Sequence, residues 1–319
     1  MNLLISCDWG TTNFRLRLVD RDRRESIGEV SGPEGVAAVY SRWRESGLGP
    51  KGRLGFYQSV LAKEVEHLRR QTTYSTTGLP LVISGMASSS IGMAELPYRQ
   101  VPMVLTGQEL IRVAIPAIDG FEHSILLVSG VRTKDDVMRG EETQLVGCAT
   151  AGNDERIYIF PGTHSKHVRV RAGRAVDIAT YITGECFQLL ATKSILSISV
   201  SAASSDGGAV SPDFMQGVQD SQRFASILHT AFRVRTRQLL SGTSREANYQ
   251  YLSGLMIGEE LKELAGEELP IMIVGAGRMK EYYAAACEEL GCSEVCVTDA
   301  DLALVRGHCR VLEFGEGGI

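Results

Sequence analysis

The hydrophobic and polar positions of the first half predict a strand-rich segment followed by a helix and two further strands. Residues 3–6 form an apolar run, and residues 14–18 alternate apolar side chains with Arg15 and Arg17, which is the period of a hairpin with one buried face. The first half therefore carries predicted strands at residues 3–6, 14–18, 25–30, 79–84 and 124–129, and predicted helices at residues 52–70 and 141–150.

The second half repeats this order from Arg156 onward. A strand at residues 156–160 runs into a hydroxyl-rich turn, and residues 167–171 alternate back as its hairpin partner. Further strands are predicted at residues 176–183, 271–274 and 295–298, and helices at residues 185–193, 213–228, 249–264 and 281–290. We therefore expect an α/β fold with two domains, residues 1–150 and 151–319, a linker at residues 151–155 and a Ser-, Ala- and Gly-rich loop at residues 197–212.

Length and composition indicate a globular protein with two domains. At 319 residues it exceeds the usual length of one domain, and two domains imply a cleft between them. The net charge of −5, without a dense Lys/Arg stripe, argues against nucleic acid or an anionic membrane as the partner. Seven cysteines, mostly in apolar surroundings, fit reduced thiols in the cytoplasm. Neither a zinc-type cysteine spacing nor an export signal or membrane span is expected.

The first predicted hairpin turns through a hydroxyl-rich segment that suits phosphate. Gly10 permits a close backbone approach, and Thr11, Thr12 and Asn13 offer side-chain and backbone donors to phosphate oxygens. Asp8, at the end of the strand, is suited to hold a hydrated magnesium ion. The alternative interpretation of this short motif is an ordinary polar hairpin.

A second turn of the same kind opens the second half. Gly162, Thr163, His164 and Ser165 provide backbone and side-chain donors, and Lys166 adds a positive charge that suits β- and γ-phosphates. Taken alone, Lys166 would be a solvated hairpin lysine. Because the turn occurs once in each half, we predict that the two turns together clamp a nucleotide.

A third glycine-containing turn follows the strand at residues 271–274. Gly275 and Gly277 precede a predicted helix and would let the backbone pass close beneath an adenine or ribose. The dinucleotide fingerprint is incomplete, because its third glycine position is occupied by Lys280. A plain strand-to-helix turn is the alternative interpretation.

The region between the halves carries the candidate groups for chemistry. Glu141 and Glu142 stand at the start of a predicted helix, where a carboxylate could accept the proton of an attacking hydroxyl, although the helix dipole alone also favours glutamate there. Arg132 and Arg139 precede them and could pair with an acidic substrate, the alternative being surface arginines. Residues 85–90 and 130–139 follow strand ends and are candidates to line one pocket.

These segments, in this order, identify a family resemblance over nearly the whole chain. The chain resembles the 2-dehydro-3-deoxygalactonokinases, bacterial sugar-acid kinases of the actin, sugar-kinase and heat-shock-ATPase superfamily. The segments that carry the resemblance are Asp8-Trp-Gly-Thr-Thr-Asn13, Ser84-Gly-Met-Ala-Ser88, Pro97-Tyr98, Met138-Arg-Gly-Glu-Glu-Thr-Gln144, Phe160-Pro-Gly-Thr-His-Ser-Lys166, Thr183-Gly-Glu185 and Phe232-Arg-Val-Arg235.

The resemblance implies two ribonuclease-H-like domains with ATP and Mg²⁺ in the cleft. It implies transfer of the γ-phosphoryl group to the 6-hydroxyl of 2-dehydro-3-deoxy-D-galactonate, with Asp8 on the metal side and Glu141 and Glu142 sharing the assignment of base. Phosphate and adenosine contacts fall on Gly10, Thr11, Thr12, Asn13, Gly162, Thr163, His164, Lys166, Gly275 and Gly277. We expect the substrate contacts at Gly85, Met86, Ala87, Ser88, Tyr98, Arg132 and Arg139.

Several alternatives stay open at this stage. The Gly-Ala-Gly-Arg-Met sequence of the third turn and the loop at residues 197–212 depart from the family pattern, so nucleotide preference and sugar-acid selectivity are undetermined. The same fold would also serve an ATP hydrolase, a nucleotide-dependent switch or an inactive sugar-acid-binding regulator. Association with a second copy of the chain is left open.

Overall fold

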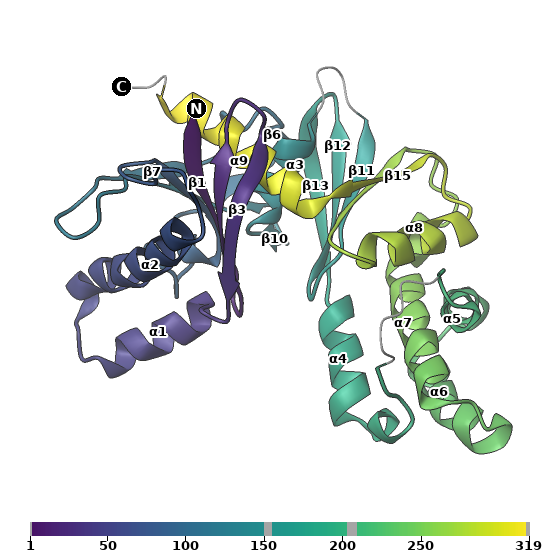
Figure 1. The fold of residues 1–319 in the computed structure, drawn as a ribbon. Helices are drawn as coiled ribbons and strands as arrows, with labels where there is room; N and C mark the ends of the chain where they lie inside the picture. The colour runs from purple at the N-terminus through teal and green to yellow at the C-terminus, as the bar shows by residue number, and fades with distance from the viewer. Residues whose placement is uncertain (1, 150–154, 203–208, 317–319) are drawn as a thin grey trace. The chain divides into compact units, whose positions relative to one another are not determined.

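The structure, a computed structural model, describes residues 2–149, 155–202 and 209–316, and it divides into two compact units (Figure 1). Of the expected linker and loop, residues 151–154 and 203–208 lie outside the described residues. The last helix, α9 (Ala300–Glu316), belongs to the first unit, although it follows the second half in the sequence. Unit 1 comprises Met1–Asp154, Val170–Ile178 and Ala300–Ile319, and unit 2 comprises Glu155–Arg169 and Ala179–Asp299.

The sheet of unit 1 has the strand order β3-β2-β1-β4-β8-β7. Its first three strands are antiparallel, and β4 and β8 run parallel to β1, so the five strands predicted for the first half are confirmed. The pairing places Asp8 opposite Arg15 on one side and Ser84 on the other. The strands are β1 (Leu3–Trp9), β2 (Phe14–Asp20), β3 (Glu25–Gly32), β4 (Leu81–Gly85), β7 (Arg112–Ile115) and β8 (Ile125–Val128).

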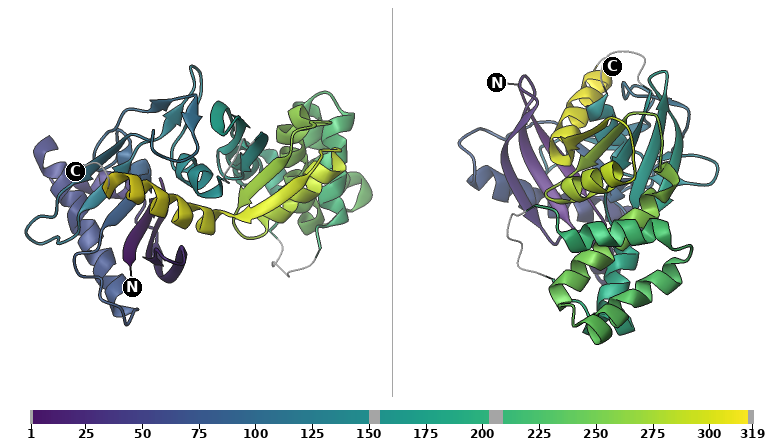
Figure 2. Two further views of the ribbon diagram at one scale, coloured as in Figure 1. Left: turned by 90° about the horizontal axis from the view of Figure 1, so that it is seen from above. Right: turned by 90° about the vertical axis from the view of Figure 1, so that its right-hand side faces the viewer.

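Helices cover both faces of this sheet. On one face, Ile5 and Trp9 pack in the same core as Tyr57 of α2 (Arg53–Arg70), the predicted helix, with α1 (Val36–Glu45) beside it. On the other face, α9 lies along the strands, as the yellow helix beside the purple strands in Figure 2 shows, and α3 (Glu141–Cys148) packs against α9. The sequence pattern predicted α2 and α3 but neither α1 nor α9.

Close helix contact and a buried histidine fix α9 in unit 1. Side chains at Gly147 of α3 or Gly307 of α9 would overlap the facing backbone, so these glycines allow the two helices to touch. His308 contacts both β1 and β4, with Nδ1 2.7 Å from Ser6 Oγ and Nε2 3.0 Å from Ser84 Oγ. Burial, reinforced by Arg17, lowers the pKa of His308 to about 3, so the ring bridges β1 and β4 in its neutral form.

Small segments complete unit 1 around the end of β4. A short 3-10 helix, η2 (Met86–Ser88), follows β4 directly. A three-stranded sheet has the order β10-β9-β5, and another short strand, β6, pairs with β13 at the edge of the second large sheet. The short strands are β5 (Arg99–Gln100), β6 (Met103–Val104), β9 (Val131–Arg132) and β10 (Val137–Met138).

The second large sheet repeats the strand order of the first. Its order is β15-β14-β11-β12-β13-β6, in which β14 and β15 run parallel to β11 as β4 and β8 run parallel to β1. All five predicted strands of the second half are confirmed, and the order third-second-first-fourth-fifth therefore occurs twice along the chain. They are β11 (Arg156–Phe160), β12 (Ser165–Arg171), β13 (Arg174–Tyr181), β14 (Ile271–Gly275) and β15 (Val295–Asp299).

Five helices accompany the strands of unit 2 among the described residues. The predicted helix at residues 213–228 is wrong as one element, because the chain breaks at Phe224, whose backbone is extended and whose ring lies under the Arg233 guanidinium. No helix in the described ranges has the length and apolar character needed to cross a membrane. The helices of unit 2 are α4 (Thr183–Lys193), α5 (Pro212–Arg223), α6 (Ile227–Ser241), α7 (Arg245–Leu261) and α8 (Met279–Glu289).

Candidate active site

The first turn is held from behind by the start of α1. Within the turn, Gly10 N–H donates to Asn13 O at 2.9 Å. The amides of Val36 and Ala37, the first two residues of α1, donate to Gly10 O at 2.9 Å and Thr11 O at 3.1 Å. These bonds engage the turn's carbonyl groups, which would otherwise repel an anion. The sequence reading missed α1 and hence this support.

The open side of the turn faces a cavity within unit 1. Asp8, Gly10, Thr12 and Asn13 line this cavity of about 500 Å³ together with Arg15, whereas Thr11 is exposed and is not among its lining residues. Loss of hydration raises the pKa of Asp8 above its ordinary value, and the nearby Arg15 and Arg17 oppose this shift. A carboxylate, hydroxyl donors and a guanidinium therefore share one polar cavity.

Two glycines bring the end of β4 and the start of α3 against Asp8. Gly85 has φ +87°, and a Cβ there would lie 2.8 Å from Trp9 O and 3.6 Å from Asp8 Oδ1. Gly140 has φ +114°, and a Cβ there would lie 3.5 Å from Gly85 Cα. Both backbone conformations favour glycine. As a result, Asp8, the β4 end and the first turn of α3 meet in one place.

The two adjacent glutamates of α3 differ sharply in environment. Glu142 is fully buried, and its carboxyl accepts hydrogen bonds from Gly140 N–H at 2.7 Å and Thr143 Oγ1 at 3.2 Å. Burial, followed by the neighbouring Glu141 charge, raises the pKa of Glu142 to about 8. Glu141 is partly exposed, and its Oε2 accepts from Arg139 N–H at 3.1 Å. The two side chains are therefore not interchangeable.

Most of the predicted substrate residues gather around Arg139. Its Nη1 donates to Ser88 O at 2.7 Å and to Ser88 Oγ at 2.5 Å, and its guanidinium carbon lies 4.1 Å from the Tyr98 ring centroid. In the same η2 turn, Met86 packs against the core and Ala87 is buried within it. Arg132, in contrast, is exposed on β9. Arg139, Ser88 and Tyr98 therefore form one wall, to which Arg139 also contributes a positive charge.

The second turn is supported by the start of α4, much as the first is by α1. Glu185 N–H donates to Thr163 O at 3.1 Å. A Cβ at Gly184 would lie 2.6 Å from Gly162 O and 2.8 Å from Thr163 Cα, so only glycine allows this approach. In unit 1, a Cβ at Gly35, just before α1, would likewise overlap the backbone of Thr12.

The charged side chains of the second turn lie in different surroundings. Lys166 is 7% exposed, and no hydrogen bond or ion pair of its amino group is found within the described residues. The stem of Lys166 is therefore covered by protein, whereas its amino group keeps contact with solvent. His164 is exposed, with Nε2 2.7 Å from Glu185 Oε2. An amino group that reaches solvent and has no protein partner within the described residues is available to bind an anion.

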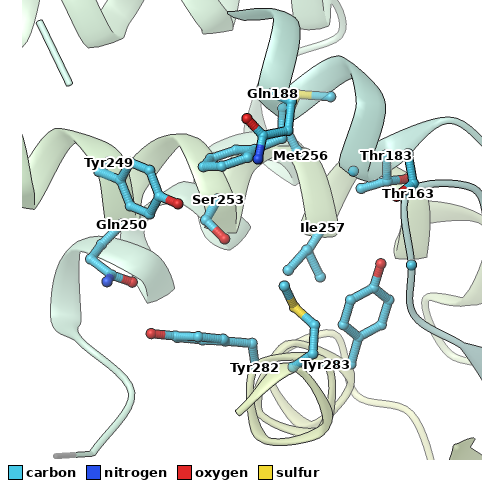
Figure 3. Close-up of a pocket in the computed structure, with 14 residues that line it drawn as sticks. Thr163, Thr183, Gln188, Tyr249, Gln250, Ser253, Met256, Ile257, Tyr282 and Tyr283 are labelled. Atoms are coloured by element: carbon cyan, nitrogen blue, oxygen red, sulfur yellow. The ribbon is translucent and has the colours of Figure 1, made fainter. Parts of the chain in front are cut away.

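A largely apolar cavity of about 400 Å³ adjoins the second turn within unit 2 (Figure 3). Gly162 and Thr163 form one edge, and Tyr282 and Tyr283 of α8 form a wall. Gln188, Tyr249 and Ser253 bring polar groups to the opposite side in Figure 3. A pocket of this size, with aromatic walls and few polar groups, suits a heteroaromatic ligand.

The predicted adenosine turn lies at the end of β14 and is not part of this lining. Gly275 ends the strand, where a Cβ would lie 3.1 Å from Lys280 Cβ, and Gly277 has φ +54°. Neither lines the cavity, which instead draws Met279, Tyr282 and Tyr283 from the helix that follows. The tyrosines of α8 escaped the sequence analysis, although an aromatic pair after a glycine turn was the available signal.

The sequence analysis also missed a buried acid behind the second turn. Glu260 of α7 accepts hydrogen bonds from Ser165 Oγ at 2.6 Å, His167 Nε2 at 2.9 Å and the Tyr283 hydroxyl at 2.6 Å. Burial raises its pKa, but hydrogen bonds from His167, Ser165 and Thr183 outweigh burial, so the net pKa lies below the ordinary value. No sequence signal links Glu260 to a turn almost a hundred residues earlier.

Comparison with known proteins identifies the family of the chain. A family model described as 2-keto-3-deoxy-galactonokinase matches residues 8–311. A Rhizobium meliloti (strain 1021) protein named as a probable 2-dehydro-3-deoxygalactonokinase is 33% identical over 310 residues, covering 94% of this chain and 93% of that protein. The 2-dehydro-3-deoxygalactonokinase of Escherichia coli (strain K12) is 29% identical over 312 residues, covering 95% of both.

Solved structures extend the comparison to the fold. A crystal structure of a Sinorhizobium meliloti protein assigned the same activity has a TM-score of 0.80 and 30% identity, covering 97% of this chain and 96% of that chain. The activator of 2-hydroxyisocaproyl-CoA dehydratase from Clostridium difficile, solved with bound ADPNP, has a TM-score of 0.50 and 13% identity over 98% of this chain and 95% of its own. At that identity the second likeness concerns the fold alone.

Proposed function

Because the chain belongs to the 2-keto-3-deoxy-galactonokinase family, we propose that it transfers the γ-phosphoryl group of ATP to the 6-hydroxyl of 2-dehydro-3-deoxy-D-galactonate. It is a kinase, a phosphotransferase with an alcohol group as acceptor. The observation that carries the detailed assignment is the meeting of Asp8, Gly85 and the Gly140–Glu141 segment in unit 1. Phosphoryl transfer depends mainly on positioning the reactants and on stabilising charge. Asp8 would stabilise charge through the metal, and the Gly140–Glu141 segment would position the acceptor hydroxyl.

ATP is assigned to groups in both units. In unit 2, the aromatic cavity beside Gly162 would take the base, and Lys166 would neutralise phosphate oxygens. In unit 1, the donors of Thr12 and Asn13 would take the transferring phosphate, at the close approach that Gly10 permits. The proposal includes the two ribonuclease-H-like domains that the family resemblance implies, and a location in the cytoplasm, where ATP is available.

Asp8 is the proposed metal-side residue. Within the described residues no group of three or more His, Cys, Asp and Glu side chains could hold an ion by itself. One carboxylate in a polar cavity fits Mg²⁺, which keeps several waters and is usually shared with substrate phosphates. When bound, Mg²⁺ would neutralise charge on the phosphate oxygens.

Glu141 is the proposed base, and Glu142 is proposed to shape the turn in front of it. Glu142 is buried, its carboxyl is occupied by Gly140 N–H and Thr143, and it retains its proton up to about pH 8. Glu141 is partly exposed on the same turn, and we assign to it the acceptance of the hydroxyl proton. The sugar acid would lie against the Ser88, Tyr98 and Arg139 wall.

A coupled ADP-release assay over a panel of 2-keto-3-deoxy sugar acids and related aldonic acids tests the proposal. We expect ADP release only with a sugar acid present and best with 2-dehydro-3-deoxy-D-galactonate. Glu141→Gln is expected to lower kcat by about 100-fold or more, the usual contribution of a general base, and Glu142→Gln far less. Equal turnover without any sugar acid would instead identify an ATP hydrolase, and ligand binding without turnover would identify a regulator.

A further inference from the structure

Buried polar side chains converge on Glu260 behind the second turn of unit 2. The Glu260 side chain is 1% exposed. Ser165 Oγ and His167 Nε2 donate to its Oε1 at 2.6 and 2.9 Å, and the Tyr283 hydroxyl donates to its Oε2 at 2.6 Å. The Thr183 side chain adds a fourth hydrogen bond. Burying a carboxylate costs free energy unless its oxygens are hydrogen-bonded, and both oxygens of Glu260 accept hydrogen bonds.

The donors come from elements that border the proposed nucleotide site. Ser165 closes the second turn, Thr183 starts α4, and Tyr283 belongs to the α8 wall of the cavity. In Figure 3, the Tyr283 hydroxyl points toward Thr183 and Thr163. Glu260 of α7 therefore contacts two parts of the proposed site. One is the cavity edge next to the phosphate turn, and the other is the wall that would contact the base.

The geometry also constrains Lys166 directly. Ser165 and His167 both point to Glu260, and side chains alternate along a strand, so Lys166 points to the opposite face of β12. Glu260 thus holds both neighbours of Lys166. The single Ser165 hydroxyl proton serves Glu260, since Phe160 O lies farther away, at 3.3 Å.

We propose that Glu260 is a positioning residue for the triphosphate of the nucleotide. Its carboxylate holds Ser165 and His167 on either side of Lys166, so that the amino group is directed before ATP arrives. This inference rests on the proposed assignment of ATP to unit 2. It differs from a general structural role, because weakening the bonds from Ser165 and His167 should weaken the phosphate contacts more than those of the base.

Calorimetric binding of ATP and of adenosine to the full-length protein tests this inference, with Glu260→Gln as the main variant. The substitution keeps the size of the side chain, and its amide oxygen can still accept from Ser165 and His167, but this oxygen is neutral. The two charge-assisted hydrogen bonds that hold the neighbours of Lys166 therefore become weaker, whereas the new NH₂ can donate to the Tyr283 hydroxyl. We expect the Kd of ATP to rise about 10-fold, or about 1.4 kcal/mol, and the Kd of adenosine to change less than about 2-fold. The KM of the sugar acid should stay unchanged.

Two further variants test separately the hydrogen bonds that Glu260 accepts from the phosphate turn and from the cavity wall. A surface glutamate provides the matched control. Ser165→Ala removes the donor of the phosphate turn and should weaken ATP but not adenosine. Tyr283→Phe removes the donor of the cavity wall and should weaken both ligands to the same degree. Glu263→Gln, at an exposed carboxylate that accepts from the Tyr181 hydroxyl at 3.0 Å, should change neither.

Each outcome bears on the inference. Equal weakening of ATP and adenosine by Glu260→Gln, or no weakening, would overturn it. If Glu260→Gln does not fold, judged by circular dichroism, an unchanged ATP affinity in Ser165→Ala overturns it instead. Wild-type protein that phosphorylates sugar acids while Glu260→Gln binds ATP normally refutes only this inference, whereas wild-type protein that binds no ATP refutes the proposed function as well.

Discussion

Replacing Glu142 by glutamine should make the protein more stable at alkaline pH, which is unusual for a substitution at a fully buried position. The amide has nearly the shape of the carboxyl group. Its oxygen can accept from Gly140 N–H, and its NH₂ can donate to Thr143 Oγ1, so both observed contacts have a replacement. The substitution therefore removes the ionisable group while keeping its hydrogen bonds.

The size of the effect follows from the two states of the carboxyl group. In the unfolded chain Glu142 ionises near its ordinary pKa of 4.5, whereas in the native state burial and Glu141 hold its pKa at about 8. Between pH 4.5 and 8 the unfolded chain binds fewer protons than the native protein. The stabilising contribution of protonated Glu142 is therefore complete below pH 4.5, decreases as the pH rises and is lost above about pH 8. At about 1.4 kcal/mol per pKa unit the ceiling is about 5 kcal/mol, and relaxation around the charge should reduce it to about 2 kcal/mol.

Urea unfolding of the wild type and Glu142→Gln, followed by circular dichroism at several values between about pH 5 and 9, measures this difference. We expect the midpoint of the variant to gain on that of the wild type as pH rises, with similar slopes. Glu141→Gln is the matched control on the adjacent residue, and its difference from the wild type should vary less with pH. Parallel midpoints of the wild type and Glu142→Gln over the whole range would refute the reasoning.

Three substitutions test other parts of the site. Lys166→Met should raise the KM of ATP about 10-fold or more by removing the positive charge while keeping the covered stem, and an unchanged KM would argue against a phosphate contact. Gly184→Ala places a Cβ 2.6 Å from Gly162 O, so ATP affinity in calorimetry should fall together with the melting temperature; normal values of both would show that the turn adapts. Arg139→Lys loses the paired bonds to Ser88, so the KM of the sugar acid should rise several-fold while that of ATP holds, and the reverse pattern would remove Arg139 from the acceptor side.

Local pattern determined most of the elements because their causes are local. Alternation at residues 14–18 and the apolar runs predicted the strands, since each side chain's face depends on its position in a period of two. The two turns at Gly10 and Gly162 were predicted as phosphate sites from their glycine and hydroxyl residues, because the donors of a turn come from adjacent residues. The same pattern failed where tertiary contacts decided, as at Phe224, where packing under Arg233 ends a helix that the periodicity continues.

The sequence by itself also determined the family, through ordered motifs that span nearly the whole chain, but it left Glu141 and Glu142 equivalent. Only the fold separates them, because the same backbone turn buries one carboxyl and leaves the other partly exposed. The fold likewise decided the hydrogen bonds of Glu260, whose donors lie far away in the sequence. The charge state and hydrogen bonds of a carboxyl group depend on which residues surround it in space, and local sequence does not specify those neighbours.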